Sequence, residues 1–256
     1  MAQSYSTDRL ELTGLREIPL VEEGDDLGEV LAAALGANHV QLRANDVLVI
    51  AQKIVSKAEG RLVVLEQVVP SDEALRRAAE TEKDARLVEL ILRESREVVR
   101  QANNLIITEN RLGMVMANAG IDQSNVIDGT ALLLPEDPDA SAARLSEDLH
   151  RRFGVHAGVI VADSIGRAWR NGIVGHAIGV AGIKALMDLR QTTDLYGREL
   201  RVTEVALADE MAAAATLIMG QGGEGIPAVL IRGFGPFDDT NNAGALVRDK
   251  QRDLFR

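Results

Sequence analysis

The sequence predicts a mixed fold of the α/β or α+β class, and two patterns carry this prediction. Short apolar runs lie between turn signals and are interleaved with helical patterns, whereas a β-sandwich would have regularly spaced strands. Several runs are apolar throughout, which is typical of strands buried on both faces of a sheet. Strands are expected at residues 46–51, 104–108, 112–117, 155–162, 173–180 and 226–231.

Three segments have the periodicity of helices. Residues 71–94 predict one or two charged helices, with Ser71 as the N-cap. Two further helices are expected at residues 139–153 and 203–219, and the second of them ends at Gly220.

The domain organisation follows from length and from the absence of linkers. At 256 residues the chain can bury roughly 70–75% of its unfolded surface in a core of its own. It has no repeat and no low-complexity hinge. Residues 1–256 are therefore expected to form a single unit, with a small helical subdomain near residues 71–100.

Composition excludes several classes of protein. A net charge of −11 and an aromatic content of 3% argue against a nucleic-acid binder, which needs a basic surface and stacking platforms. The absence of cysteine excludes disulfides, thiolate catalysis, Cys-ligated zinc and iron–sulfur clusters. The N-terminus lacks a secretory signal and no run approaches the roughly 18 apolar residues of a membrane span. We therefore expect a cytoplasmic protein with no membrane partner.

A glycine-rich segment, GQGGEG at residues 220–225, is a candidate phosphate loop. It matches the pattern G-x-G-x-x-G but follows a predicted helix and precedes a strand, the reverse of the order in a dinucleotide-binding fold. Its backbone N–H groups could instead form a nest for phosphate. The alternative is a flexible turn in which glycine supplies positive φ, although four glycines in six residues exceed what one turn needs.

Two aspartates follow predicted strands. Asp122 lies in the polar stretch after the strand that ends at Ala117, and Asp163 with Ser164 follows the strand that ends at Ala162. If the strand ends converge, these oxygens suit Mg²⁺ or Mn²⁺. The alternative for each aspartate alone is a turn or a helix cap.

A group of polar residues follows the predicted strand 46–51. It contains Gln52, Lys53, Ser56 and Lys57, and the chain has only five lysines in all. A compact ammonium group is a good partner for phosphate. The alternative is a solvated helix or loop face. No zinc-protease or nucleophile-elbow motif is present, so acyl chemistry through a protein nucleophile has no visible carrier.

These same loops carry a family resemblance. The sequence resembles the coenzyme F420-0:L-glutamate (γ-glutamyl) ligases over nearly its whole length. The blocks that carry the resemblance are GLREIPLVEEGDDL (14–27), DVLVIAQKIVSKAEGR (46–61), NAGIDQSNV (118–126), GVIVADSIGRAWRNGIVGHAIGVAGI (158–183), DLYGREL (194–200) and MGQGGEGIPAVLIRG (219–233).

The resemblance implies an unusual α/β fold with mixed sheets, an intertwined homodimer and a ligase activity. In that activity, GTP drives the attachment of L-glutamate to F420-0 and then of further γ-linked glutamates, with Mg²⁺ or Mn²⁺. The γ-phosphoryl group passes to the acceptor carboxylate, the glutamate amine attacks the acyl phosphate, and GDP and phosphate leave. The alternatives are a related carboxylate–amine ligase with another acceptor and a non-catalytic nucleotide-binding protein.

The resemblance also implies the site residues. Asp122 and Asp163 are the essential catalytic positions, and Asp122, Asp163, Ser164 and Gln221 are the implied metal ligands. The implied nucleotide contacts are Ile18, Pro19, Leu20, Val21, Gln52, Lys53, Lys57, Asn125, Met219, Gly220, Gln221, Gly222, Gly223, Glu224, Gly225 and Ile226.

Two departures from the family pattern are present. Gln221 stands where relatives often have an acidic residue, and His176 where they have Phe. Gln221 lowers the negative charge of the site, which puts the metal count in doubt. Some relatives carry a second, flavin-binding domain, and we expect none after Arg256.

Overall fold

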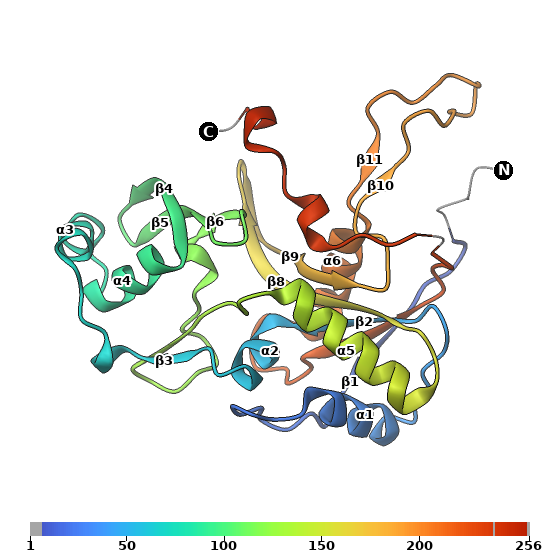
Figure 1. The fold of residues 1–256 in the computed structure, drawn as a ribbon, viewed down its shortest axis with the longest axis horizontal. Helices are drawn as coiled ribbons and strands as arrows, with labels where there is room; N and C mark the ends of the chain where they lie inside the picture. Colours follow the sequence, from blue (N-terminus) through green and yellow to red (C-terminus); the bar gives the residue numbers. More distant parts are fainter. Residues whose placement is uncertain (1–6, 238, 255–256) are drawn as a thin grey trace.

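A five-stranded sheet forms the centre of the molecule in this computed structural model, which describes residues 7–237 and 239–254 (Figure 1). The spatial order is β1 (Glu11–Leu15), β12 (Ala228–Arg232), β2 (Val47–Ala51), β8 (Gly158–Arg167) and β9 (Arg170–Ala181). The β2–β8 pair is parallel and the other pairs are antiparallel, so the sheet is mixed, as predicted.

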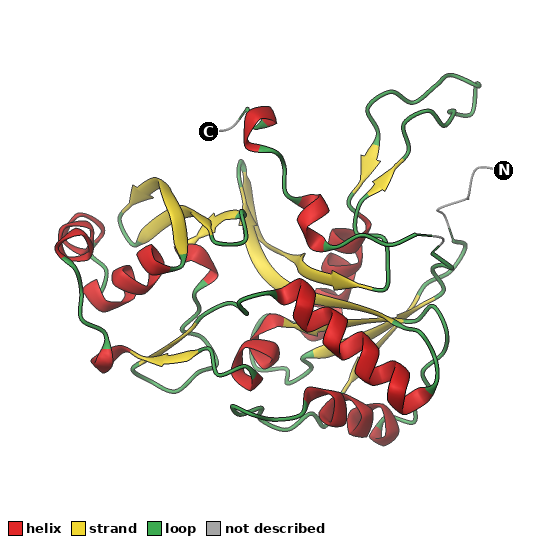
Figure 2. Cartoon of the chain, viewed as in Figure 1, coloured by secondary structure: helices red, strands yellow, loops and turns green. Residues whose placement is uncertain are grey.

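Both faces of the middle of this sheet are buried because the inner stretches of its strands, such as Val47–Ala51, are apolar. Along β2, Leu48 and Ile50 belong to one core cluster, while Val47 and Val49 belong to another on the opposite face. The first face is covered by α1 (Leu27–Ala37), α2 (Gln52–Ala58) and α5 (Pro138–Phe153), and the second by α6 (Leu207–Met219) (Figure 2).

The helices pack closely on β9 because glycines leave room for them. A Cβ atom at Gly179 would lie 2.2 Å from the Pro138 carbonyl oxygen at the start of α5. On the opposite face, a Cβ atom at Gly175 would lie 2.5 Å from the Ala212 carbonyl oxygen of α6. These positions fix β9 between its two helical neighbours.

A second structural region has its own core cluster. It consists of α3 (Asp72–Thr81), α4 (Ala85–Arg93), β4 (Ser95–Ala102), β5 (Leu105–Asn110) and β6 (Val115–Ala117) (Figure 1). Two short strands, β3 (Leu62–Val64) and β7 (Thr130–Leu132), pair beside it.

The prediction of helices at residues 71–94 is confirmed, and the strand that follows them was not predicted. The Ser71 side chain caps α3 as expected by accepting from the Ala74 N–H. The helices end at Arg93, and the residues from Ser95 onward, which were expected within a helical subdomain near residues 71–100, form β4. The β-branched pair Val98 and Val99 and antiparallel pairing with β5 favour the strand.

Two further boundaries differ from the prediction. The helix expected from residue 203 begins at Leu207, because β11 (Glu204–Val205) pairs with β10 (Met187–Asp188) in a projecting arm (Figure 1). The strand expected to end at Ala162 continues to Arg167. None of the helices in the described residues is both long and apolar enough to cross a membrane.

Candidate nucleotide and metal site

The candidate site begins where two parallel strands leave the sheet side by side. Ala51 of β2 pairs with Ala162 of β8, so the residues that follow them, Gln52 and Asp163, are neighbours at the carboxyl ends of these paired strands. Ligands of open α/β sheets bind at such carboxyl ends of strands. Asp163 was expected in a loop, but it lies within β8 because it pairs with His176 of β9.

A short hydrogen-bonded cluster joins α2 to the loop that contains Asp122. Lys53 Nζ lies 2.5 Å from Asp122 Oδ2, and it donates to Ser124 Oγ at 2.5 Å and to the Ser124 carbonyl oxygen at 3.3 Å. The Ser124 backbone N–H donates to the other oxygen, Asp122 Oδ1, at 2.6 Å. Both oxygens of this carboxylate therefore have partners, and the loop is held against α2.

Lys57 makes the second contact between the same helix and loop. Its Nζ donates to the Asn125 carbonyl oxygen at 2.9 Å. Burial lowers the pKa of Lys57, and the positive charge of Lys53 acts in the same direction. The two ammonium groups are thus close enough to repel each other, as expected of cations gathered for an anion.

The glycine-rich loop closes the site from the third side. It lies between α6 and β12, as predicted from the sequence. Ser164 Oγ donates to Gln221 Oε1 at 2.8 Å, and Asn125 Nδ2 donates to the Gly222 carbonyl oxygen at 3.2 Å. The Gly222 N–H donates to Glu224 Oε2 at 2.8 Å, so within the loop a backbone donor already binds a carboxylate oxygen.

The two aspartates have opposite electrostatic environments. Burial raises the pKa of Asp163 to about 7, and the negative charge of Asp122 contributes to the increase. Burial also acts to raise the pKa of Asp122, but hydrogen bonds from Lys53 and from the Ser124 N–H outweigh it, and this pKa is lowered. Asp163 is therefore the carboxylate whose burial outweighs the opposing effects of the Ser164 N–H, the Lys53 charge and the Gln52 side chain.

The structure thus brings together most of the polar residues that the sequence singled out. The residues in this set are Gln52, Lys53, Lys57, Asp122, Asn125, Asp163, Ser164, Gln221, Gly222 and Glu224. Four segments far apart in the sequence supply them.

The apolar residues predicted to contact the nucleotide do not join this polar cluster as a group. Val21 is buried in the core, Ile18 packs partly against it, and Leu20 is 90% exposed. Met219 and Ile226, at the two ends of the glycine-rich loop, are also buried. Their contacts with nucleotide remain predictions.

Sequence reasoning missed Ser124. This residue bonds both Lys53 and Asp122 and so links the two. The signal was present, because an aspartate followed two residues later by a small polar residue commonly forms a turn closed by the carboxylate.

A family model described as F420-0:Gamma-glutamyl ligase matches residues 16–233. The chain belongs to the F420-0:gamma-glutamyl ligase family.

Relatives in this family are similar over nearly their full length. A protein named coenzyme F420:L-glutamate ligase from Methanothermobacter thermautotrophicus is 47% identical over 250 residues, which cover 96% of this chain and 99% of the relative. Proteins of the same name from Methanopyrus kandleri and Methanocaldococcus jannaschii are 48% and 41% identical. They cover 94% and 97% of this chain, and 97% of each relative is covered.

The donor set of this family member fits a hard divalent cation. Asp122 and Asp163 supply carboxylates, Ser164 a hydroxyl and Gln221 an amide oxygen, which are the ligand types that Mg²⁺ and Mn²⁺ prefer. Among the described residues no three His, Cys, Asp or Glu side chains gather as a metal-binding group. The set would supply two charged ligands, Asp122 and Asp163, and a cation there would offset the burial that raises the pKa of Asp163.

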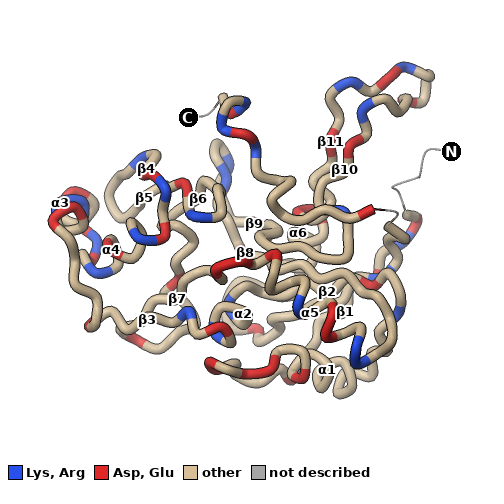
Figure 3. The backbone as a smooth tube through the Cα atoms, viewed as in Figure 1, with Lys and Arg blue, Asp and Glu red and all other residues tan. Residues whose placement is uncertain are grey.

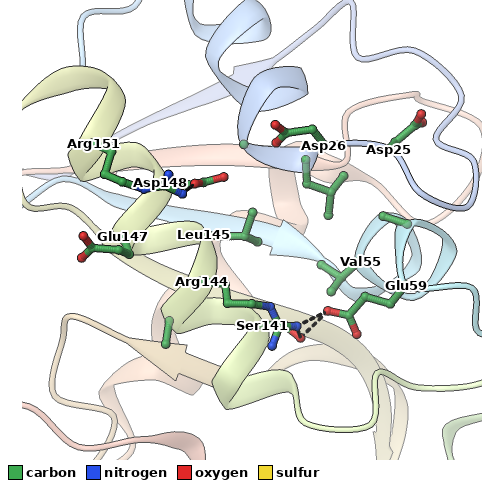
Figure 4. A pocket seen from close by; sticks show the side chains of 14 residues that line it. Asp25, Asp26, Val55, Glu59, Ser141, Arg144, Leu145, Glu147, Asp148 and Arg151 are labelled. Atoms are coloured by element: carbon green, nitrogen blue, oxygen red, sulfur yellow. Dashed lines mark hydrogen bonds and ion pairs between the residues drawn. The ribbon is translucent and has the colours of Figure 1, made fainter.

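A cavity away from the candidate site has the wrong charge for a nucleotide. A cavity of about 620 Å³ lies between α1, α2 and α5, and it contains five carboxylates against two arginines, Arg144 and Arg151 (Figure 4). Arg144 is already engaged with Glu59 at 2.6 Å. No residue predicted for the site lines this cavity.

The positively charged residues of the chain are not concentrated in one segment. Lys and Arg are distributed along the whole chain rather than gathered on one element (Figure 3).

Proposed function

We propose that this protein is a GTP-dependent ligase that attaches L-glutamate to coenzyme F420-0 and then adds further γ-linked glutamates. Membership of the family supports the class of reaction. One observation supports its location: Lys53 and Lys57 of α2 contact the loop of Asp122 and Asn125, and that loop in turn contacts the glycine-rich segment.

The proposed division of roles follows the chemistry of the residues. Lys53, Lys57 and the glycine-rich loop bind the phosphates of GTP, because ammonium groups and backbone N–H groups are phosphate donors. Asp122, Asp163, Ser164 and Gln221 hold Mg²⁺ or Mn²⁺, which supplies neutralisation of the phosphoryl charge.

The reaction then depends mainly on positioning. A carboxylate oxygen of F420-0 attacks the γ-phosphorus, the bond to the β,γ-bridging oxygen breaks, and GDP leaves. The neutral amine of glutamate attacks the acyl carbon of the resulting acyl phosphate, loses a proton and displaces phosphate as the amide forms. No covalent bond to the protein is required, in agreement with the absence of a nucleophile motif.

The test is mass spectrometry of F420-0 after incubation with the purified protein, L-glutamate, GTP and Mn²⁺ or Mg²⁺. Glutamyl mass increments that require every component are expected, and the number of increments counts the residues added. GTP binding without any increment would contradict the proposal and favour another acceptor or a non-catalytic role. Replacement of GTP by ATP tests the nucleotide.

A further inference from the structure

The buried Gln52 amide has an unsatisfied donor at the candidate site. Gln52 is 1% exposed, and its Nε2 has no hydrogen-bond partner in the described structure. Two other buried side-chain atoms share this condition, Thr108 Oγ1 and His150 Nδ1, and neither belongs to the site. Since an unpaired buried N–H is costly, a donor left free here indicates an acceptor that arrives with the substrates.

Ser56 fixes the other end of the same amide. Gln52 and Ser56 lie four residues apart on one face of α2, and Ser56 is 0% exposed. Ser56 Oγ donates to Gln52 Oε1 at 2.8 Å. A hydroxyl has a single proton, and here it is used on the amide oxygen, so Nε2 is the end of the amide that is left for the site.

The orientation of the Gln52 amide matters because the Asp163 carboxyl group is its neighbour. Asp163 is the neighbour of Gln52 across β2 and β8, and the Gln52 side chain acts on it as a donor that lowers its pKa. One of the two N–H groups of Nε2 therefore faces Asp163 from beyond hydrogen-bond distance, and the other is left for a further acceptor. A rotated amide would turn Oε1 toward this carboxylate, and two partially negative oxygens would repel each other. The Ser56 hydroxyl disfavours that rotation because it binds Oε1 on the opposite side.

We propose that Ser56 is a positioning residue, whose hydroxyl locks the Gln52 amide so that Nε2 donates to an anionic oxygen of a substrate beside Asp163. That oxygen belongs to a phosphoryl group of the nucleotide or to the acceptor carboxylate. Ser56 itself is fully buried and contacts neither the phosphoryl group nor the acceptor carboxylate. The inference rests on the proposed ligase function and adds a specific residue to its machinery.

The test is a double-mutant cycle with Ser56→Ala and Gln52→Met, which keeps the length of the side chain but removes the amide. Ser56→Ala alone is expected to lower kcat/KM for glutamate ligation about tenfold, as for the loss of one oriented hydrogen bond to a charged group. In the Gln52→Met background the same change is expected to have less than about a twofold effect, because there is no amide left to orient.

Ser146→Ala is the matched control. It removes a comparable hydroxyl contact, from Ser146 Oγ to the Ala157 carbonyl oxygen at 2.8 Å, in α5. Thermal midpoints of Ser56→Ala and Ser146→Ala are expected to fall by similar amounts, with kcat/KM unchanged in the control. Equal activity losses from Ser56→Ala in both backgrounds, or no loss in either, would overturn the proposal.

Binding experiments show whether the oxygen that accepts from Gln52 Nε2 belongs to the nucleotide or to the acceptor carboxylate. They also separate a failure of the ligase proposal from a failure of the Ser56 positioning proposal. If the acceptor is a phosphoryl oxygen, calorimetry with GTP and Mn²⁺ will show about tenfold weaker binding in Ser56→Ala. If it is the substrate carboxylate, GTP affinity is unchanged and KM for F420-0 rises. If the wild-type protein forms no glutamyl product, the ligase proposal fails by itself. Unchanged GTP affinity in Ser56→Ala would then overturn the positioning role too.

Discussion

At the scale of single residues, the candidate site combines two carboxylates, of Asp122 and Asp163, with the ammonium groups of two lysines. The Lys53 ammonium and the Ser124 N–H satisfy Asp122, and its pKa is lowered. Asp163 is more deeply desolvated and has the charge of Asp122 nearby, so its pKa is raised. Titratable groups whose environments push their pKa values apart mark functional sites, and this contrast was invisible in the sequence.

Asp122→Asn is expected to lower kcat for glutamate ligation by about 100-fold or more, because the change removes one of two charged ligands from a charge-neutralising site. The fold is expected to persist, since a partly exposed ion pair is worth about 0–1 kcal/mol. Steady-state assays and a thermal melt measure both. Asp128→Asn, an exposed change in the same loop, is the control. Normal turnover in Asp122→Asn would contradict the metal assignment.

Asp163→Asn is expected to stabilise the protein in the presence of a metal chelator. The pKa of Asp163 is raised from 3.8 to about 7 on folding, so the native state holds a proton that the unfolded state releases. Stability therefore falls as pH rises from about 4 to about 7. The thermal midpoint of Asp163→Asn should exceed that of the wild type clearly at pH 8 and much less at pH 4. An equal difference at both pH values would exclude this origin.

At the scale of elements, apolar runs were the reliable signal. All six predicted strands overlap an observed strand, because runs such as VLVIA at Val47–Ala51 are buried whatever their neighbours. The helix Leu27–Ala37 was missed since glycines and alanines weaken its pattern. The strand Ser95–Ala102 was taken for helix because its polar residues resemble the preceding charged helix, and only pairing with β5 decides its conformation.

Two glycine substitutions test the packing of helices on the sheet, and they are expected to change the free energy of unfolding in opposite directions. Gly179→Ala places a Cβ atom 2.2 Å from the Pro138 carbonyl oxygen, so we expect destabilisation by about 1–3 kcal/mol. Gly36→Ala in α1 meets no atom within 4 Å and should stabilise by about 0.5–1 kcal/mol. Denaturant unfolding of both variants is the measurement. Equal effects would show that α5 does not pack on β9 as described.

At the scale of the whole molecule, the strand order β1-β12-β2-β8-β9 assembles the site. It places β2 beside β8 although about 110 residues separate them in the sequence, and it brings the loop before β12 to the same edge. The arm that carries β10 and β11 projects from this body and exposes Leu195, Tyr196 and Val202 almost fully. The homodimer implied by the family resemblance stays a prediction.

The dimer is testable through this arm. Light scattering is expected to give a mass twice that of one chain, because a projecting arm with exposed apolar side chains is suited to contact a second copy. Leu195→Glu combined with Val202→Glu should shift the mass toward one chain. Val69→Glu, at an exposed position outside the arm, should leave it unchanged. A monomeric wild type would refute the prediction.

The sequence by itself determined the class of fold, the family and the identity of most candidate site residues. These properties reside in local patterns: apolar runs, the glycine-rich segment, and blocks such as NAGIDQSNV that keep their order along the chain. Only the tertiary structure decided that Lys53 would pair with Asp122, that Ser124 would join them and that Ser56 would orient Gln52. Such contacts depend on strand register and on burial, and both are set by partners distant in the sequence rather than by neighbouring residues.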